Sequence, residues 1–277
     1  MDHIVLYTGR QEDLLSSFSE LDIEVYRLQL KNFNKHIQNL RREKKSNDVI
    51  FLGWMYHGNL IALLFSFLVR NVKVCWTLRC NYKPEVERLF TRVIIYIHQI
   101  LFSAPDFLIS NSYSGWESHR KKSFNSVTNY EIIPNGIDFQ SPRFNKKSIQ
   151  NFLIDPGPRT RVFGHLARFH RIKDQSTFIL AANRIVKEFP DTIIVLAGKG
   201  VDWNNEKLTS LIPAKLKKNF LFLGNLEVQQ VNEFFEKIDV FCLTSKEEGF
   251  PNVLLEAISC GKPCISTDVG DVSRMLG

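Results

Sequence analysis

Short apolar runs alternate with longer amphipathic stretches along the chain, and this alternation predicts its secondary structure. Runs of β-branched and aromatic residues are typical of strands, and apolar residues spaced three and four apart are typical of helices. The predicted strands are Ile4–Tyr7, Ile23–Tyr26, Val49–Leu52, Val72–Trp76, Phe107–Ser110, Val162–His165, Thr192–Ala197, Phe220–Leu223, Val240–Leu243 and Pro263–Ser266. The predicted helices are Asn59–Val69, Glu85–Phe102, Gln175–Phe189, Val228–Lys237 and Val253–Cys260. Because strands and helices alternate with short connections, we expect an α/β fold with parallel sheets covered by helices on both faces.

The stretch 134–161 separates two such series. It is rich in Asn, Pro, Gly and basic residues, its apolar periodicity is weak, and a new β-α-β series starts at Val162. We therefore divide the chain near residue 145, into an N-terminal domain of residues 1–145 and a C-terminal domain of residues 146–277.

Two apolar runs, Leu60–Val69 and Val93–Phe102, must be compared with the length that a membrane-spanning helix requires. Each is ten residues long, whereas a helix that spans a bilayer needs roughly 20 apolar residues. Both are therefore expected to be buried helices. The N-terminal sequence MDHIVLYTGR has no basic segment followed by an apolar stretch, so no secretory signal is predicted.

The composition, with 44% hydrophobic and 23% charged residues, is that of a soluble globular protein. The net charge of +7 is uneven, because residues 1–150 carry 20 Lys and Arg against 14 Asp and Glu, and the remainder 16 against 15. A solvated basic face explains this excess, and so does a surface that meets phospholipid head groups or a lipid diphosphate. Nucleic acid is disfavoured, because the basic residues are not interleaved with aromatic residues in a recognisable binding module.

The five cysteines are scattered, and no pair has the spacing of a zinc site. Their odd number suits a reduced cytosolic protein better than a disulfide scaffold. The predicted location is therefore cytoplasmic.

The most informative segment directly follows the predicted strand Val240–Leu243 and reads SKEEGFPNVLLEA from Ser245. Open α/β sheets bind their ligands at the carboxyl ends of strands. Gly249 frees the backbone for a tight turn, and Pro251 suits the first position of a helix. The backbone N–H groups of Asn252 and its neighbours at that helix N-terminus favour phosphate or hydroxyl oxygens.

Two carboxylates belong to this segment. Glu248 lies just before the predicted helix and Glu256 lies on it, eight residues further on. A carboxylate accepts two hydrogen bonds at once, so this pair is suited to the two ends of one extended ligand. The alternative is that Glu248 is a charge favoured by the helix dipole and Glu256 an exposed helical residue.

A second polar set, GHLARFHRIKD from Gly164, also follows a predicted strand. Arg168 offers a planar fork of donors and Lys173 a point charge, so together they are suited to grip a diphosphate. Ordinary surface charge is the alternative, and Arg171 is equally eligible. Asp174 is expected to cap the following helix.

On these residues the chain resembles the retaining GT-B glycosyltransferases of family 4. The resemblance extends over essentially the whole chain and is most specific from 240 to 267. Its strongest matches are Arg168, Lys173, the Glu248…Glu256 pair, Ser245…Gly249-Phe250-Pro251 and Gly261-Lys262-Pro263. Weaker matches are Ile133-Pro134-Asn135-Gly136-Ile137-Asp138, Ile109-Ser110-Asn111-Ser112 and Tyr56-His57. The resemblance implies two Rossmann-like domains whose parallel sheets face each other across a cleft.

The resemblance also implies an activity, the transfer of a sugar from a nucleoside-diphosphate sugar to an acceptor hydroxyl with retention of configuration. Arg168 and Lys173 would neutralise the leaving diphosphate. Glu248 would sit beside the donor sugar, Glu256 would hold the nucleoside ribose, and His57 would reach the donor sugar from the first domain. The remaining donor-site residues would be Gly249, Phe250, Pro251, Asn252 and Val253. As an isolated residue, His57 would more often cap the helix expected from Asn59.

Family frequency favours a UDP-linked hexose or N-acetylhexosamine as donor, with GDP-mannose second. The implied acceptor is a glycan or lipid-linked sugar of a cell-surface polysaccharide or lipopolysaccharide, used at the cytoplasmic face of a membrane. No Asp-x-Asp motif is present, so the resemblance implies neither a metal ion nor a cofactor besides the substrate.

The sequence departs from the family at its two ends. No Gly-Gly pair follows a first strand, and the chain stops soon after the strand Pro263–Ser266, so we expect elements to be missing at both ends. An incomplete nucleotide-sugar-binding remnant is therefore the main alternative. A sugar-nucleotide epimerase and a nucleic-acid-binding protein are weaker alternatives.

Overall fold

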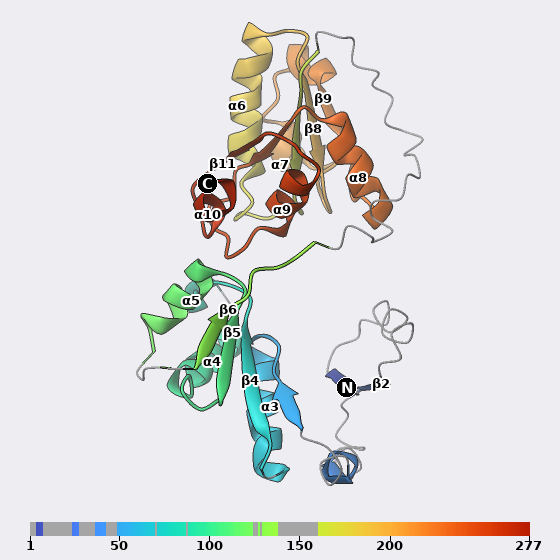
Figure 1. Cartoon of the computed structure of the whole chain (residues 1–277). Helices are drawn as coiled ribbons and strands as arrows, with labels where there is room; N and C mark the ends of the chain where they lie inside the picture. Colours follow the sequence, from blue (N-terminus) through green and yellow to red (C-terminus); the bar gives the residue numbers. More distant parts are fainter. Residues whose placement is uncertain are drawn as a thin grey trace.

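A computed structural model describes residues 4–7, 24–27, 37–42, 49–69, 71–86, 88–123, 127, 129–137 and 160–277. Two larger parallel sheets lie in separate lobes (Figure 1). The first lobe, residues 49–137, has the strand order β3-β4-β5-β6, and the second, residues 160–277, has the order β11-β10-β7-β8-β9. The predicted α/β fold with two parallel sheets is confirmed. The boundary predicted near residue 145 lies outside the described residues, so the division into 1–145 and 146–277 stays a prediction.

The first lobe packs helices against a four-stranded sheet. Its strands are β3 (Ile50–Leu52), β4 (Lys73–Leu78), β5 (Phe107–Ser110) and β6 (Tyr130–Ile132). Its helices are α3 (Met55–Leu68), the 3₁₀ turn η2 (Pro84–Val86), α4 (Leu89–Ile100) and α5 (Tyr113–Arg120). The core lies between them and is built around Trp76, Phe102, Leu108 and Trp116, all almost fully buried. A separate parallel pair consists of β1 (Ile4–Tyr7) and β2 (Glu24–Arg27).

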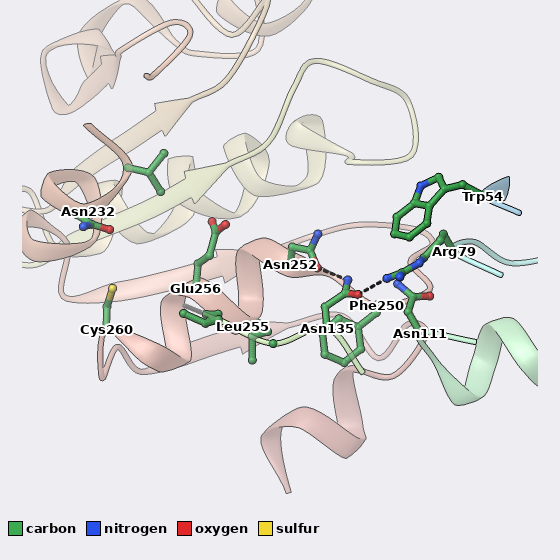
Figure 2. Close-up of a pocket in the computed structure, with 13 residues that line it drawn as sticks. Trp54, Arg79, Asn111, Asn135, Asn232, Phe250, Asn252, Leu255, Glu256 and Cys260 are labelled. Carbon is green, nitrogen blue, oxygen red and sulfur yellow. Dashed lines mark hydrogen bonds between the residues drawn. The ribbon is translucent and has the colours of Figure 1, made fainter. Parts of the chain in front are cut away.

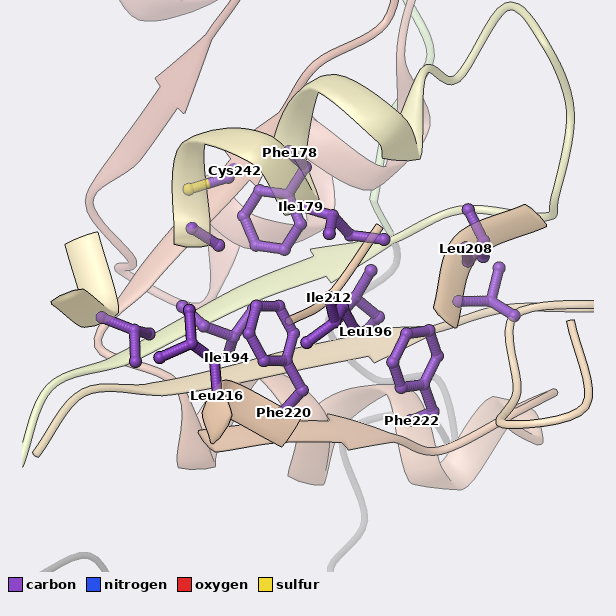
Figure 3. Close-up of a cluster of buried hydrophobic side chains, with 13 residues drawn as sticks. Phe178, Ile179, Ile194, Leu196, Leu208, Ile212, Leu216, Phe220, Phe222 and Cys242 are labelled. Atoms are coloured by element: carbon purple, nitrogen blue, oxygen red, sulfur yellow. The ribbon is translucent and has the colours of Figure 1, made fainter. Parts of the chain in front are cut away.

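The second lobe has helices on both faces of its sheet. Its strands are β7 (Val162–Leu166), β8 (Ile193–Ala197), β9 (Phe220–Phe222), β10 (Val240–Leu243) and β11 (Cys264–Ser266). Its helices are α6 (Gln175–Glu188), α7 (Glu206–Thr209), the 3₁₀ helix η4 (Ala214–Asn219), α8 (Val228–Lys237), α9 (Asn252–Ser259) and α10 (Val272–Leu276). One apolar cluster fills the space between α6 and the sheet (Figure 3), and a second packs α8 and α9 against the other face. Strand β8, between β7 and β9, is buried on both faces, which explains its continuous apolar sequence.

Two predictions about the first lobe are wrong in detail. The helix predicted from Asn59 begins at Met55. Asn59 therefore lies within the helix rather than at its start. Its buried side chain forms hydrogen bonds with both the N–H and the C=O of Thr77 in β4. The helix predicted over Glu85–Phe102 is divided into η2 and α4, since Arg88 between them has extended backbone angles.

The expectation that both apolar runs form buried helices is also wrong for the second of them. Helix α4 buries Ile95, His98 and Gln99 on one face. Its other face exposes large apolar side chains with between 39% and 76% of their surface accessible, namely Leu89, Phe90, Val93, Tyr96, Ile97 and Ile100. Within the described residues, no helix is long and apolar enough to cross a bilayer.

Candidate functional site

A cavity of about 690 Å³ lies between the two lobes (Figure 2). The first lobe contributes Trp54, Arg79, Asn111, Asn135, Gly136 and Ile137 to its wall, and the second contributes Val231, Asn232, Phe250, Asn252, Leu255, Glu256 and Cys260. Arg79 directly follows β4, and Asn111 directly follows β5. The cavity therefore lies at the carboxyl ends of parallel strands, where α/β sheets bind their ligands.

The structure brings two of the predicted charged residues into direct contact. Lys173 Nζ lies 2.5 Å from Glu248 Oε1, although the residues are 75 positions apart in the sequence. The hydroxyl of Ser245 donates a hydrogen bond of 2.7 Å to the same carboxylate oxygen. Both side chains of the ion pair are largely buried, with 22% of Lys173 and 11% of Glu248 accessible. This burial strengthens their attraction relative to that of a surface pair.

The other two charged candidates are Glu256 and Arg168. Glu256 is on α9 and lines the cavity, near Asn252 and Leu255 (Figure 2). Arg168 is exposed on the loop after β7, and its carbonyl accepts a hydrogen bond of 2.9 Å from the side chain of Gln175. Neither Arg168 nor the Lys173–Glu248 pair is among the residues that line the cavity. The diphosphate role of Arg168 and Lys173 stays a prediction.

The segment that carries Glu248 forms a turn and then enters α9. Pro251 precedes the helix at the N-cap position, one residue earlier than its predicted place, because its backbone is extended. Asn252 begins the helix, and its side-chain oxygen accepts a hydrogen bond of 2.7 Å from Asn135 of the first lobe. A Cβ on Gly249 would lie 3.4 Å from the Ser112 hydroxyl, so this turn packs closely against the first lobe. The N-terminus of α9, with Asn252 and Val253, thus lies at the junction of the lobes.

The sequence predicted that the Asp174 side chain caps α6, and this prediction is wrong. Its backbone has a positive φ of 46°, and the side chain makes no hydrogen bond to the N–H groups of the helix. Its carboxylate instead pairs with Lys246, 3.2 Å away, and accepts a hydrogen bond from the Thr177 hydroxyl. An N-cap residue usually has an extended backbone, so the left-handed backbone of Asp174 accounts for the difference.

His57 is not among the residues that line the cavity. It is exposed in the first turn of α3, and its ring centroid is 6.2 Å from that of Phe90 in α4. The early start of α3 at Met55 explains this position, because His57 belongs to the helix rather than to a loop at the strand end. The contact of His57 with the donor sugar has no support in this arrangement and stays a prediction.

Arg79 and Trp54 form a part of the site that the motifs did not reveal. The guanidinium carbon of Arg79 lies 4.0 Å from the centroid of the Trp54 ring, a cation–π contact. Its Nη1 donates a hydrogen bond of 2.6 Å to the side-chain oxygen of Asn135. Its Nε is buried without a partner among the described residues, and burial lowers the pKa of this side chain. An anion in the cavity would therefore stabilise the charged form of the Arg79 side chain.

Asn111 is a second polar residue of the cavity wall that could accept a further hydrogen bond. The residue is only 4% exposed, and its side-chain oxygen has no hydrogen-bond partner among the described residues. Leaving a buried acceptor unpaired costs free energy, so a hydroxyl group of a ligand is a favourable partner. Asn111 belongs to one of the weaker sequence matches named above. Arg79 also directly follows a strand, and the strand-end rule applied to the first lobe would have found it.

Comparison with known proteins agrees with this geometry. Residues 160–277 match the family described as Glycosyl transferases group 1. The chain is 32% identical over 142 residues to the Escherichia coli UDP-Gal:alpha-D-GlcNAc-diphosphoundecaprenol alpha-1,3-galactosyltransferase, covering 50% of this chain and 36% of that protein. It is 24% identical over 231 residues to the Campylobacter jejuni N-acetylgalactosamine-N,N'-diacetylbacillosaminyl-diphospho-undecaprenol 4-alpha-N-acetylgalactosaminyltransferase, covering 83% of this chain and 59% of that protein.

Among solved structures, HepE of Anabaena in complex with UDP is similar over 100% of this chain and 83% of its own, with a TM-score of 0.74 and 17% sequence identity. The two lobes thus have the GT-B fold of glycosyltransferases. The match to the Glycosyl transferases group 1 family thus covers the second lobe, residues 160–277. It spans between about a third and three fifths of the length of the two relatives named above.

Proposed function

We propose that this protein transfers a sugar from a nucleoside-diphosphate sugar to an acceptor hydroxyl, with retention of anomeric configuration. The observation that carries the proposal is the cavity between the lobes, which joins Glu256 and the start of α9 to polar groups of the first lobe. UDP is the proposed nucleotide, because HepE of Anabaena binds UDP with the same fold. The transferred sugar is proposed to be a hexose or an N-acetylhexosamine.

In the proposed complex the second lobe holds the donor. The carboxylate of Glu256 accepts hydrogen bonds from the two vicinal ribose hydroxyls. The first N–H groups of α9 and the cations of Arg168 and Lys173 face the diphosphate. As the sugar–phosphate bond breaks, negative charge grows on the leaving phosphate. Lys173, already held in place by Glu248, then stabilises that charge without a large rearrangement.

The first lobe completes the proposed site. Arg79 is poised to bind an anionic oxygen of the ligand, and the buried oxygen of Asn111 to accept a hydrogen bond from a sugar hydroxyl. The incoming acceptor hydroxyl attacks the anomeric carbon on the face that the phosphate leaves. Its proton passes to the departing phosphate, so no enzymatic nucleophile is needed. We propose that no metal ion takes part.

Nucleotide binding tests the donor site. Added UDP is expected to raise the melting temperature by several degrees, since a ligand at about 100 times its Kd stabilises the folded state by about 2.7 kcal/mol. Glu256→Gln is expected to weaken UDP binding by roughly 10- to 100-fold, because a charged acceptor is lost. Glu206→Gln, at an exposed residue of α7, is the matched control and should bind UDP normally.

The outcomes of this experiment separate the alternatives. A melting temperature unchanged by UDP, GDP and ADP, and by their sugar derivatives, would contradict the proposal. UDP binding with no transfer and no donor hydrolysis would identify a binding remnant instead of an enzyme. Product formed without an acceptor and with altered sugar stereochemistry would identify an epimerase.

We also propose that the acceptor is a lipid-linked sugar reached at the cytoplasmic surface of an anionic membrane. The names of both relatives contain a diphosphoundecaprenol acceptor, which supports this class. The exposed apolar face of α4 supports the membrane contact, because Arg88, which precedes the helix, and Arg92 within it are both exposed. Apolar side chains flanked by arginines suit the boundary between lipid head groups and acyl chains.

Vesicle binding tests the α4 surface. The protein should sediment with vesicles of phosphatidylcholine and phosphatidylglycerol, and far less with phosphatidylcholine alone or in 0.5 M salt, because exposed charges are screened. Replacement of both Phe90 and Tyr96 by serine should reduce binding by about tenfold or more. Phe189→Ser, which changes another exposed phenylalanine, in the second lobe, is the control. Equal binding by all three proteins would contradict this surface.

A further inference from the structure

The turn that carries Glu248 is held from the first lobe by three side chains. Asn81 donates a hydrogen bond of 2.8 Å to the carbonyl of Glu248, and the Ser114 hydroxyl donates one of 3.2 Å to the carbonyl of Gly249. Lys83 forms an ion pair of 2.6 Å with Glu247. The position of Glu248 therefore depends on contacts with residues more than 100 positions away in the sequence.

Asp271 joins the same junction from the second lobe. It is 3% exposed and precedes α10, but its carboxylate does not cap that helix. Its two oxygens accept hydrogen bonds of 2.7 and 2.8 Å from the backbone N–H groups of Tyr113 and Ser114, in the first turn of α5. Ser112 already accepts from Gly115 as the N-cap. The N-terminus of a first-lobe helix is thus completed by a carboxylate of the other lobe.

The backbone around Asp271 connects this cap to the Glu248 turn. The N–H of Asp271 donates a hydrogen bond of 3.1 Å to the carbonyl of Gly249. Gly270 has a positive φ of 61°, and a Cβ there would lie 2.4 Å from the carbonyl oxygen of Glu248. Arg274, one turn further on, places its guanidinium 4.0 Å from the ring centroid of Tyr113. The segment from Gly270 to Arg274 therefore contacts both the turn and α5.

We infer that Asp271 is a positioning residue that couples closure of the two lobes to the placement of Glu248 beside the donor sugar. This inference rests on the proposed transferase function. The carboxylate is attracted to the positive end of α5 and satisfies two N–H groups there. When it binds them, Asn81 and Ser114 reach the carbonyls of the Glu248 turn. When the lobes separate, that turn loses its first-lobe partners, although the nucleotide-binding residues of the second lobe keep theirs.

Replacement of Asp271 tests this coupling. Asp271→Asn keeps the shape but removes the charge, and one of its two polar atoms no longer accepts a hydrogen bond. It is expected to lower the kcat for donor hydrolysis by roughly 10- to 100-fold, while the Kd for UDP changes by less than about threefold. Small-angle X-ray scattering should give a larger radius of gyration than for the unmodified protein, with and without UDP. Asp271→Glu, which keeps the carboxylate, should recover part of the kcat.

Two further variants make the result specific. Asp268→Asn removes the same charge from an exposed residue three positions earlier, and should leave kcat and scattering unchanged. Asn81→Leu removes the first-lobe donor to the Glu248 carbonyl without altering the second lobe. It should lower kcat in the same way and leave the Kd for UDP unchanged.

The inference is overturned if Asp271→Asn has the kcat and the radius of gyration of the unmodified protein. It is also overturned if the UDP affinity and melting temperature of this variant fall together with kcat and Asp271→Glu is no better, because Asp271 then only supports the fold. If the unmodified protein binds no UDP, the proposed function fails. The scattering comparison without nucleotide still decides whether Asp271 holds the lobes together.

Discussion

Lys173→Met is expected to reduce sugar transfer or donor hydrolysis by about 100- to 1,000-fold, the size of effect seen when one preorganised donor is removed from a developing negative charge. Methionine has nearly the length of lysine but no charge. The Kd for UDP should rise much less than kcat falls, because the charge on the leaving phosphate is greatest in the transition state. Initial rates with a saturating UDP-sugar and calorimetry with UDP measure the two quantities.

The same substitution also leaves Glu248 without its cation, so a loss of stability must be separated from a loss of catalysis. Glu248 is 11% exposed and would retain Ser245 as its hydrogen-bond donor. An unpaired, largely buried carboxylate lowers the free energy of unfolding. The double variant Lys173→Met with Glu248→Gln removes both charges and should recover the melting temperature, but not the activity.

A matched control for Lys173 is Lys187→Met, at an exposed residue of α6. It should leave both the rate and the UDP affinity unchanged. Transfer by Lys173→Met within about threefold of the unmodified rate would contradict the role of Lys173 in leaving-group stabilisation.

The sequence predicted most elements of the second lobe, because its inner strands are buried and its longer helices are amphipathic. Strand Val240–Leu243 and helix Val228–Lys237 have the predicted bounds. Strand Thr192–Ala197 begins one residue later than predicted, at Ile193. In such elements the apolar pattern and the tertiary environment favour the same secondary structure, so the local sequence is enough to predict it.

Helix α5 shows why other elements were missed. Its sequence, YSGWESHR, is mostly polar and contains a glycine, so it has no helical apolar pattern. Tertiary contacts stabilise it instead, since Trp116 and His119 are buried and Asp271 binds its first turn. A partner 158 positions away in the sequence leaves no local signal.

Of the site residues predicted in the second lobe, Phe250, Asn252 and Glu256 line the cavity, and their roles stay predictions. Glu248 was paired with Glu256, and Lys173 with Arg168, on the basis of two strand-end motifs, and the structure brings Lys173 and Glu248 into contact. Arg79 lacks a surrounding motif, and its place in the cavity depends on Trp54 and Asn135. His57 was assigned by resemblance alone, and the earlier start of α3 directs it toward Phe90.

Acidification is expected to unfold the protein at a pH well above the range in which carboxylates titrate, because three histidines are buried in neutral form. Burial lowers the pKa of His98 to about 3, with a further contribution from nearby His119. Burial likewise lowers the pKa of His119 to about 4 and that of His165 to about 4. In the unfolded chain a histidine has a pKa of about 6.5. Each folded-state pKa is thus depressed, so the unfolded chain binds more protons as the pH falls below 6.5.

The direction in which stability changes with pH follows from this difference between the folded and unfolded pKa values. The stability that the three neutral histidines contribute is present above about pH 6.5 and is lost as the pH falls toward about 4. Each contributes up to about 1.4 kcal/mol per pH unit, so the free energy of unfolding should fall by roughly 3–4 kcal/mol per pH unit near pH 5.5. Since domains are stable by about 5–15 kcal/mol, this slope is enough to unfold the protein at mildly acidic pH.

Urea unfolding at a series of pH values between 7 and 5.5 measures this slope. His119→Gln should reduce it by about a third, whatever its effect on stability at pH 7, because one of the three protons is no longer taken up. Replacement of the exposed His57 by glutamine is the control for the loss of an imidazole elsewhere in the protein. A free energy of unfolding that does not vary across this range would mean that His98, His119 and His165 are not held neutral in the folded protein.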